Sequence, residues 1–183
     1  LIVERLRDYY GLEKRPVKVI EPYQMLGEID DELLSAMDID VIGLYGEKNM
    51  FGIKNSGWKP AMTPWSQEVL LPGDFNLTYN DNGDFLISPE GDTSVIPCAM
   101  MPKTGFFFDA LNRQKPIDDS ELKVEDNLEE FTPVTAHDLE YWKNAAMEGA
   151  AKGKGVAASL GGTALGDIAL VPGLNLKDPK GIR

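Results

Sequence analysis

A glycine-rich turn at residues 161–166 is the segment of this sequence with the clearest potential for chemistry. It follows an apolar run at 156–160, which predicts a strand, and its two end glycines have the spacing that opens a phosphate-binding loop. Asp167 and Ile168 stand where that loop needs Lys and then Ser or Thr, so the motif is incomplete. A dinucleotide-binding pattern fails as well, because the neighbouring glycines precede the predicted strand.

Two residues of this turn remain candidates for ligand binding. Gly162 allows the backbone to come close to a ligand, and the hydroxyl of Thr163 can cap the helix predicted at 164–170. A tight turn with a cap explains the same residues without a ligand. Turns at the carboxyl ends of parallel strands are where α/β folds bind substrates. The sequence therefore favours ligand binding and a purely structural turn equally.

Gln24 and Asp74 are the other candidate ligand-binding side chains. Gln24 follows a β-branched run at 17–20, where a strand end would present its amide as both donor and acceptor. Asp74 lies beside Gly73 and could serve in acid–base chemistry, as could the carboxylates of the turn at 90–93. Acidic residues next to glycine are common turn formers, so a structural role is the alternative, and Gln24 is the stronger candidate.

The single cysteine and the single histidine leave almost no ligands for a soft metal. Cys98 lies between Pro97 and a pair of methionines, which is typical of a small buried apolar residue. His137 falls in the first turn of a helix that Thr135 and Asp138 are expected to cap, and we expect its side chain to be solvated. The sequence assigns no catalytic residue and no metal ligand.

Composition indicates one folded, acidic domain spanning residues 1–183. The chain has 18 Lys and Arg against 30 Asp and Glu, a formal charge of −12, and 43% hydrophobic residues, enough for a core. Such a charge argues against nucleic acid or an anionic membrane as partner, because both attract clustered basic residues. No apolar run approaches the roughly 18 residues of a membrane span, and the first residues lack the order of a secretory signal. We therefore expect a cytoplasmic protein.

The elements expected to position these residues alternate between helix and strand at both ends of the chain. Between them, residues 60–105 predict an antiparallel excursion with a hairpin turn at Asn80–Asp84. An acidic run at 118–130 is expected to be a solvated connection. The other predicted elements are helices at 1–10, 30–37, 135–150 and 164–170 and three parallel strands at 17–20, 39–44 and 156–160.

Six segments, in this order, resemble the uroporphyrinogen decarboxylase superfamily, and in particular its branch of corrinoid-linked methyltransferases. The resemblance covers nearly the whole chain and rests on Leu6–Leu12, Glu21–Glu28, Asp40–Leu44, Pro72–Phe75, Pro89–Ser94 and Ser159–Asp167. It implies an α/β fold, a partial (β/α)8 TIM barrel with an inserted antiparallel β-hairpin. Because such a barrel takes about 250 residues, the resemblance also implies a fragment that lacks the first strand and the C-terminal half of a longer enzyme.

The resemblance implies an enzyme that moves a methyl group between a corrinoid carrier, such as a corrinoid protein, and a small acceptor. The full-length enzyme would use zinc, bound by a His-x-Cys and a distant Cys, whereas no cofactor is expected within this chain. The alternative reaction is decarboxylation of a uroporphyrinogen-type substrate. Three departures weigh against it: the Arg-rich segment of the decarboxylases is replaced by Glu21–Gln24, their catalytic Asp segment by Tyr45–Glu47, and their active-site Tyr by Ala169.

A third hypothesis is a non-enzymatic interaction unit on the same scaffold. A half barrel would leave open sheet edges that need a partner chain. A homodimer would supply such a partner.

Overall fold

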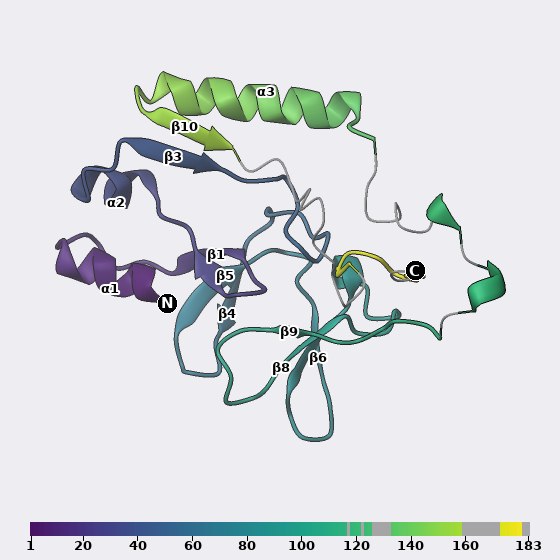
Figure 1. Ribbon diagram of the computed structural model, residues 1–183. Helices are drawn as coiled ribbons and strands as arrows, with labels where there is room; N and C mark the ends of the chain where they lie inside the picture. Colours follow the sequence, from purple (N-terminus) through teal and green to yellow (C-terminus); the bar gives the residue numbers. More distant parts are fainter. Residues whose placement is uncertain (117, 122, 126–132, 159–172, 181–183) are drawn as a thin grey trace.

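Three separate sheets form the framework of the computed structural model (Figure 1). The structure describes residues 1–183 apart from 117, 122, 126–132, 159–172 and 181–183. Its helices are α1 (Ile2–Tyr9), α2 (Asp31–Ala36) and α3 (Ala136–Ala151), with short 3-10 turns η1 (Pro89–Gly91) and η2 (Asp119–Glu121). Its strands are β1 (Val17–Glu21), β2 (Leu26–Gly27), β3 (Val41–Leu44), β4 (Lys59–Met62), β5 (Glu68–Leu71), β6 (Leu77–Tyr79), β7 (Phe85–Ile87), β8 (Ala99–Met101), β9 (Asp109–Ala110) and β10 (Gly155–Ala158).

The expectation of a partial (β/α)8 barrel is wrong. The described residues contain three α-helices and ten strands in mostly antiparallel or mixed sheets, and they form no closed barrel. Of the strands predicted to be parallel, β3 and β10 pair with each other, whereas β1 pairs in parallel with β5. The reason lies in the connections. Strands β4 to β9 follow one another through short loops, which suit antiparallel pairing, while a parallel neighbour needs a crossover of a dozen or more residues.

The central sheet, in the order β2-β1-β5-β4, shares one hydrophobic core with the meander β6-β7-β8-β9. Val19 of β1 is fully buried in this core. Phe51, from the loop after β3, joins it with the rings of Phe75 and Phe108 each 5.9 Å away. The predicted hairpin is confirmed, because β6 and β7 pair in antiparallel register around the Asn80–Asp84 turn.

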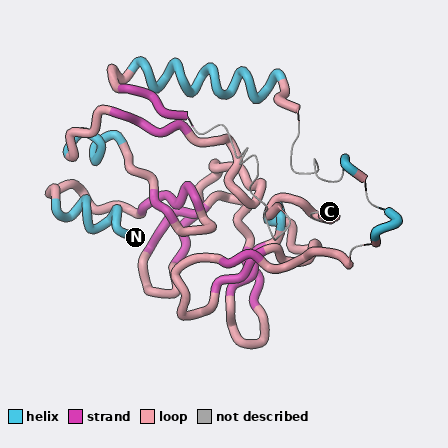
Figure 2. Tube along the Cα trace, viewed as in Figure 1, coloured by secondary structure: helices cyan, strands magenta, loops and turns pink. Residues whose placement is uncertain are grey.

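A separate layer consists of β3, α3 and β10. The two strands are parallel neighbours, and α3 precedes β10 and lies along the pair in Figures 1 and 2. Gly149 is the only buried residue of α3. A Cβ there would lie 3.1 to 3.6 Å from the side chains of Val156, Ile42 and Leu44, so the glycine permits close approach of helix and sheet. β10 itself stays exposed along its whole length.

The two short helices α1 and α2 bury a second, smaller cluster. Val3 of α1 and Leu33 of α2 pack with Val17 of β1. Among the described residues, no helix has the length and apolar character needed to cross a membrane.

Candidate functional site

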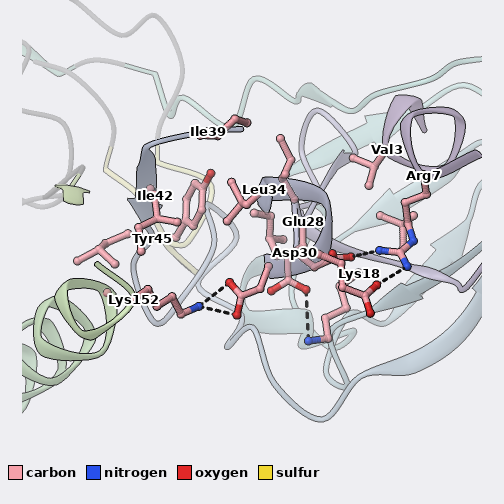
Figure 3. Close-up of a pocket in the computed structure, with 18 of the residues that line it drawn as sticks. Val3, Arg7, Lys18, Glu28, Asp30, Leu34, Ile39, Ile42, Tyr45 and Lys152 are labelled. Atoms are coloured by element: carbon pink, nitrogen blue, oxygen red, sulfur yellow. Dashed lines mark hydrogen bonds and ion pairs between the residues drawn. The ribbon is translucent and has the colours of Figure 1, made fainter. Parts of the chain in front are cut away.

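An open cleft lies between the β3–α3–β10 layer and the group formed by α1, α2 and β1 (Figure 3). Its volume of about 840 Å³ falls in the range of small-molecule sites. Apolar side chains that line it include Leu34 of α2, Ile39, and Ile42 of β3. Charged side chains such as Arg7 and Lys18 line it toward α1 and β1. The cleft therefore offers both an apolar and a charged surface to a ligand.

Arg7 organises the charged part of the cleft. Only 1% of this residue is exposed. Its guanidinium donates to Asp30 Oδ2 and Glu32 Oε2, both at 2.7 Å, and its Nε donates to the Glu13 carbonyl at 2.9 Å. Asp30 also caps α2 by accepting the backbone N–H of Leu33. Arg7 thus links α1 to the start of α2, so its role is structural.

The other basic residues of the cleft are also engaged by carboxylates. These pairs, with N–O distances of 2.6 to 3.3 Å, are Arg15 with Asp30 and Glu32, Lys18 with Glu28, and Lys152 with Asp31. A ligand with many carboxylates would have to displace these partners. The cleft is consequently poorly suited to a polyanionic substrate.

An acid–base cluster lies just after the carboxyl end of β3. Glu47 accepts from His137 Nε2 at 2.9 Å through one oxygen and from Lys54 Nζ at 2.9 Å through the other. The hydrogen bond from His137, followed by that from Lys54, lowers the pKa of Glu47, which keeps this carboxylate ionised. His137 stands in the first turn of α3, which Thr135 and Asp138 begin with the predicted capping box. Its side chain is 66% exposed.

Two tyrosines connect this cluster to the cleft. Tyr141, one turn after His137 on α3, donates its hydroxyl to the backbone carbonyl of Tyr45 at 2.9 Å. Burial, and then the charges of Glu47 and Glu148, raise the pKa of Tyr141, so its hydroxyl remains a donor. Tyr45 lines the cleft. The cleft and the acid–base cluster are thus adjacent at the carboxyl end of β3.

Gln24 lies in the turn between β1 and β2 and is not among the residues that line the cleft. Its side chain is exposed, and its backbone N–H donates to the Glu21 carboxylate at 2.8 Å, which closes the turn. The carboxylate also accepts the backbone N–H of Tyr23. These two hydrogen bonds explain the turn without any role for the Gln24 side-chain amide.

Asp74 lies in the turn between β5 and β6, where it is exposed and also outside the lining of the cleft. Its backbone carbonyl approaches Gly91 so closely that a Cβ at residue 91 would overlap the oxygen. The Asn76 side chain donates to the Gly91 carbonyl at 3.2 Å. The backbone of Asp74 therefore helps to dock this turn against η1.

The structure brings Gln24 and Asp74 to the same aromatic cluster without joining them in one site. Their neighbours Tyr23 and Phe75 both contact Phe51, with ring centroids 6.2 and 5.9 Å from it. The remaining candidates, Gly162 and Thr163, and the helix predicted at 164–170 lie outside the described residues.

The zinc ligands implied by the resemblance, a His-x-Cys and a distant Cys, are expected in the full-length enzyme and not within this chain, which has a single cysteine. Cys98 is fully buried in the main core, as predicted, and its thiol donates to the Ile87 carbonyl at 3.3 Å. Burial raises the pKa of Cys98 to about 11, so the thiolate form is disfavoured. The described part of the chain contains no group of three or more His, Cys, Asp or Glu that could hold a metal ion.

Comparison with known proteins finds no match to this chain among protein-family models, curated proteins or solved structures.

The pairing of Glu47 with His137 was missed by the sequence analysis, which expected a solvated histidine. The two residues are 90 positions apart, so no local spacing connects them. One signal was present: Glu47 closely follows a predicted strand, and His137 opens a predicted helix. Only the parallel pairing of β3 with β10 brings the start of α3 to the end of β3.

Proposed function

We propose that this chain acts in a methyltransferase that moves a methyl group from a corrinoid carrier to a small acceptor in the cytoplasm. The observation that carries the proposal is the open cleft beside the carboxyl end of β3, next to the cluster of Glu47, His137 and Lys54. Carboxyl ends of parallel strands are the usual place for substrates in α/β units. The methyl donor follows from the resemblance to corrinoid-linked methyltransferases.

The charge pattern of the cleft supports methyl transfer over decarboxylation of a uroporphyrinogen-type substrate. Such a substrate carries many carboxylates, and the basic residues of the cleft already pair with acidic side chains. We expect no coproporphyrinogen when the protein is incubated with uroporphyrinogen under anaerobic conditions. Accumulation of that product with folded protein would favour the decarboxylase instead.

Methyl transfer is tested directly with methylcobalamin and a panel of small thiols. We expect absorbance changes that report demethylation of the cobalamin, and mass spectrometry should show the matching methyl thioether. Absence of both products with folded protein, for every thiol tried, contradicts the proposal.

A pair of neighbouring alanines on α3 tests whether the cleft is the site. Ala145 lines the cleft, whereas Ala146 is exposed and does not. Ala145→Trp fills part of the cleft and should lower the rate of methyl transfer, while Ala146→Trp should leave it unchanged. Equal rates for both variants would place the reaction elsewhere.

A non-enzymatic interaction unit is the second candidate, because β10 is exposed throughout and Val41 of the paired β3 is 52% exposed. Exposed strands are ready to pair with another chain, and a homodimer is the simplest partner. Sedimentation should then show a dimer, and cobalamin titration should give no spectral response. A monomer that responds to cobalamin contradicts this candidate.

A further inference from the structure

The cleft contains one charged side chain that the rest of the described chain does not neutralise. Its charged lining residues are four basic ones, Arg7, Arg15, Lys18 and Lys152, and five acidic ones, Glu28, Asp30, Asp31, Glu32 and Glu148. All of them except Glu148 take part in the ion pairs described above. Glu148 is exposed, and no described residue forms an ion pair or a hydrogen bond with its side chain. The cleft therefore holds one unmatched negative charge.

Glu148 lies on the face of α3 that is turned to the cleft. Four residues at positions i, i+3, i+4 and i+7 line the cleft from this side of the helix, namely Ala145, Glu148, Gly149 and Lys152. Lys152 is one turn away from Glu148, but its ammonium donates to both carboxylate oxygens of Asp31, at 2.6 and 2.8 Å. Because α2 holds Lys152 in this way, the Glu148 carboxylate is available to a ligand.

Tyr45 presents an aromatic ring to the same cleft. It is 58% exposed, and Figure 3 shows its ring among the apolar lining residues, which include Leu34 and Ile42. A Cβ at residue 43 would lie 3.2 to 3.6 Å from the hydroxyl oxygen and two ring carbons of Tyr45, so the ring lies against the backbone of β3. The face of such a ring attracts cations.

The charge of Glu148 acts on the part of the cleft where Tyr45 lies. Burial, and then the charges of Glu47 and Glu148, raise the pKa of Tyr141. The Tyr141 hydroxyl donates to the Tyr45 carbonyl at 2.9 Å. The unmatched carboxylate and the aromatic ring thus belong to one region of the cleft.

We propose that the cleft binds a small organic cation, an ammonium or guanidinium compound with an apolar body. Glu148 pairs with the cationic group, the Tyr45 ring attracts it, and apolar lining residues such as Leu34 cover the body. The volume of about 840 Å³ suits a small molecule. The inference concerns binding and requires no reaction, so it goes beyond the methyl transfer proposed above.

The charge balance argues for a cation over an anion or a neutral ligand. A ligand carboxylate would be repelled by Glu148 and would find every basic lining residue already paired. A neutral ligand would leave Glu148 unmatched. The net charge of −12 also favours the approach of a cation to the whole chain.

Three ligands of similar shape test this choice of charge by isothermal titration calorimetry. Phenethylammonium is a cation, phenethyl alcohol is neutral, and phenylacetate is an anion. Phenethylammonium should bind about fivefold or more tightly than the alcohol, because a hydrogen bond to a charged group is stronger than one between neutral groups. Phenylacetate should bind most weakly. Added sodium chloride should reduce the advantage of the cation and leave the alcohol unaffected.

Matched variants assign the recognition to individual side chains. Glu148→Gln should weaken phenethylammonium binding by about fivefold or more and leave the alcohol unaffected. Glu140→Gln is its control, because it removes the same charge from an exposed position of α3 outside the lining, and it should bind like the wild-type protein. Tyr45→Leu should weaken phenethylammonium binding by about threefold, whereas Tyr45→Phe keeps the ring and should keep the affinity.

Three outcomes would overturn the inference, each with protein shown to be folded by circular dichroism. The first is a wild-type protein that does not bind phenethylammonium, and the second is one that binds the alcohol equally well. The third is an equal loss of affinity in Glu148→Gln and Glu140→Gln, which would reduce the effect to general attraction by an acidic chain. Methyl transfer is measured separately. A protein that transfers methyl groups and binds no amine overturns this inference alone, and amine binding without methyl transfer supports it while contradicting the proposed function.

Discussion

Arg7 is a buried charged residue on which the contact between α1 and α2 depends. Its buried guanidinium holds Asp30, Glu32 and the Glu13 carbonyl together. Arg7→Met should lower the free energy of unfolding by about 3 kcal/mol or more, because two carboxylates lose a buried partner. Arg15→Met removes a largely exposed partner of the same carboxylates and should cost about 0–1 kcal/mol. Urea denaturation followed by circular dichroism measures both, and similar losses for the two variants would contradict a special role for Arg7.

Asp30 should make the stability of the protein depend on pH. Burial by itself would raise the pKa of Asp30, but the hydrogen bonds from Arg15 and Leu33 and the charges of Arg7 and Arg15 outweigh burial and lower it. A carboxyl whose pKa is lower in the folded state stabilises fully above its ordinary pKa of about 3.9. That stabilisation is lost as the pH falls through the folded-state value.

Asp30→Asn isolates this effect, because asparagine keeps the cap of α2 but cannot ionise. The wild-type protein should be more stable than the variant at pH 6, and the difference should shrink as the pH falls below about 4. Urea unfolding at several pH values provides the measurement. A constant difference at all pH values would show that the charge of Asp30 contributes nothing.

At the scale of elements, the contact between η1 and the β5–β6 turn should depend on one glycine. Gly91 has a φ of +71° and would overlap the Asp74 carbonyl if it carried a Cβ. Gly91→Ala should therefore cost about 3 kcal/mol or more, from backbone strain plus displacement of a neighbouring backbone. Gly83→Ala is the control. Alanine is strained at the φ of +81° that Gly83 adopts, but the nearest atom to its Cβ would be the side chain of Lys103, 3.9 Å away. This variant should cost about 1–2 kcal/mol. Thermal unfolding of both variants measures the two losses of stability. Equal losses would contradict a steric clash at residue 91.

Local signals predicted most individual elements, but they could not predict the sheet partners. The Thr135 capping box and the Asn80–Asp84 turn act within a few residues, and both are confirmed. The pairing of Val17 with Val69 joins distant residues, and an apolar strand has the same pattern for any parallel partner. The resemblance predicted that these strands are neighbours in one barrel. In the structure, β1 pairs with β5 and β3 pairs with β10, in two separate sheets.

The candidate site was harder to predict than the elements because contacts across the chain create it. Gln24 and Asp74 were chosen for their places at predicted strand ends or turns, and the structure uses both turns to frame the aromatic core. Glu47 and His137 carry no pattern by themselves. They become a pair only when α3 folds back along β3 and β10.

At the scale of the whole molecule, the cleft lies between two parts that share little apolar packing. No described residue of β3, α3 or β10 belongs to either hydrophobic cluster. A polar contact joins this layer to α2 instead, because Lys152 at the end of α3 pairs with Asp31. Polar ties at a protein surface are individually weak. The width of the cleft therefore depends on contacts that a ligand can compete with.

The segment 173–180 packs against the main core and should open locally when Arg113, which holds it by hydrogen bonds, is replaced. Arg113 donates to the carbonyls of Leu176 and Gly173 at 2.6 and 2.7 Å, and Leu174 is buried in the core cluster. Hydrogen bonds from a charged group contribute about 1.5–3 kcal/mol each, so Arg113→Met should speed amide exchange in 173–180 by about tenfold or more. Exchange in β1 and β5 should not change, because neither strand depends on this anchor.

Lys177→Ala is the control for this anchor, because Lys177 pairs with Glu90 and Asp92 at the surface. Exposed pairs contribute about 0–1 kcal/mol, so its effect on exchange should be about fivefold or less. Hydrogen exchange read by mass spectrometry resolves the three regions in one experiment. If Arg113→Met speeds exchange equally in 173–180 and in β1, the segment unfolds only with the whole molecule. The segment is then a cooperative part of the core.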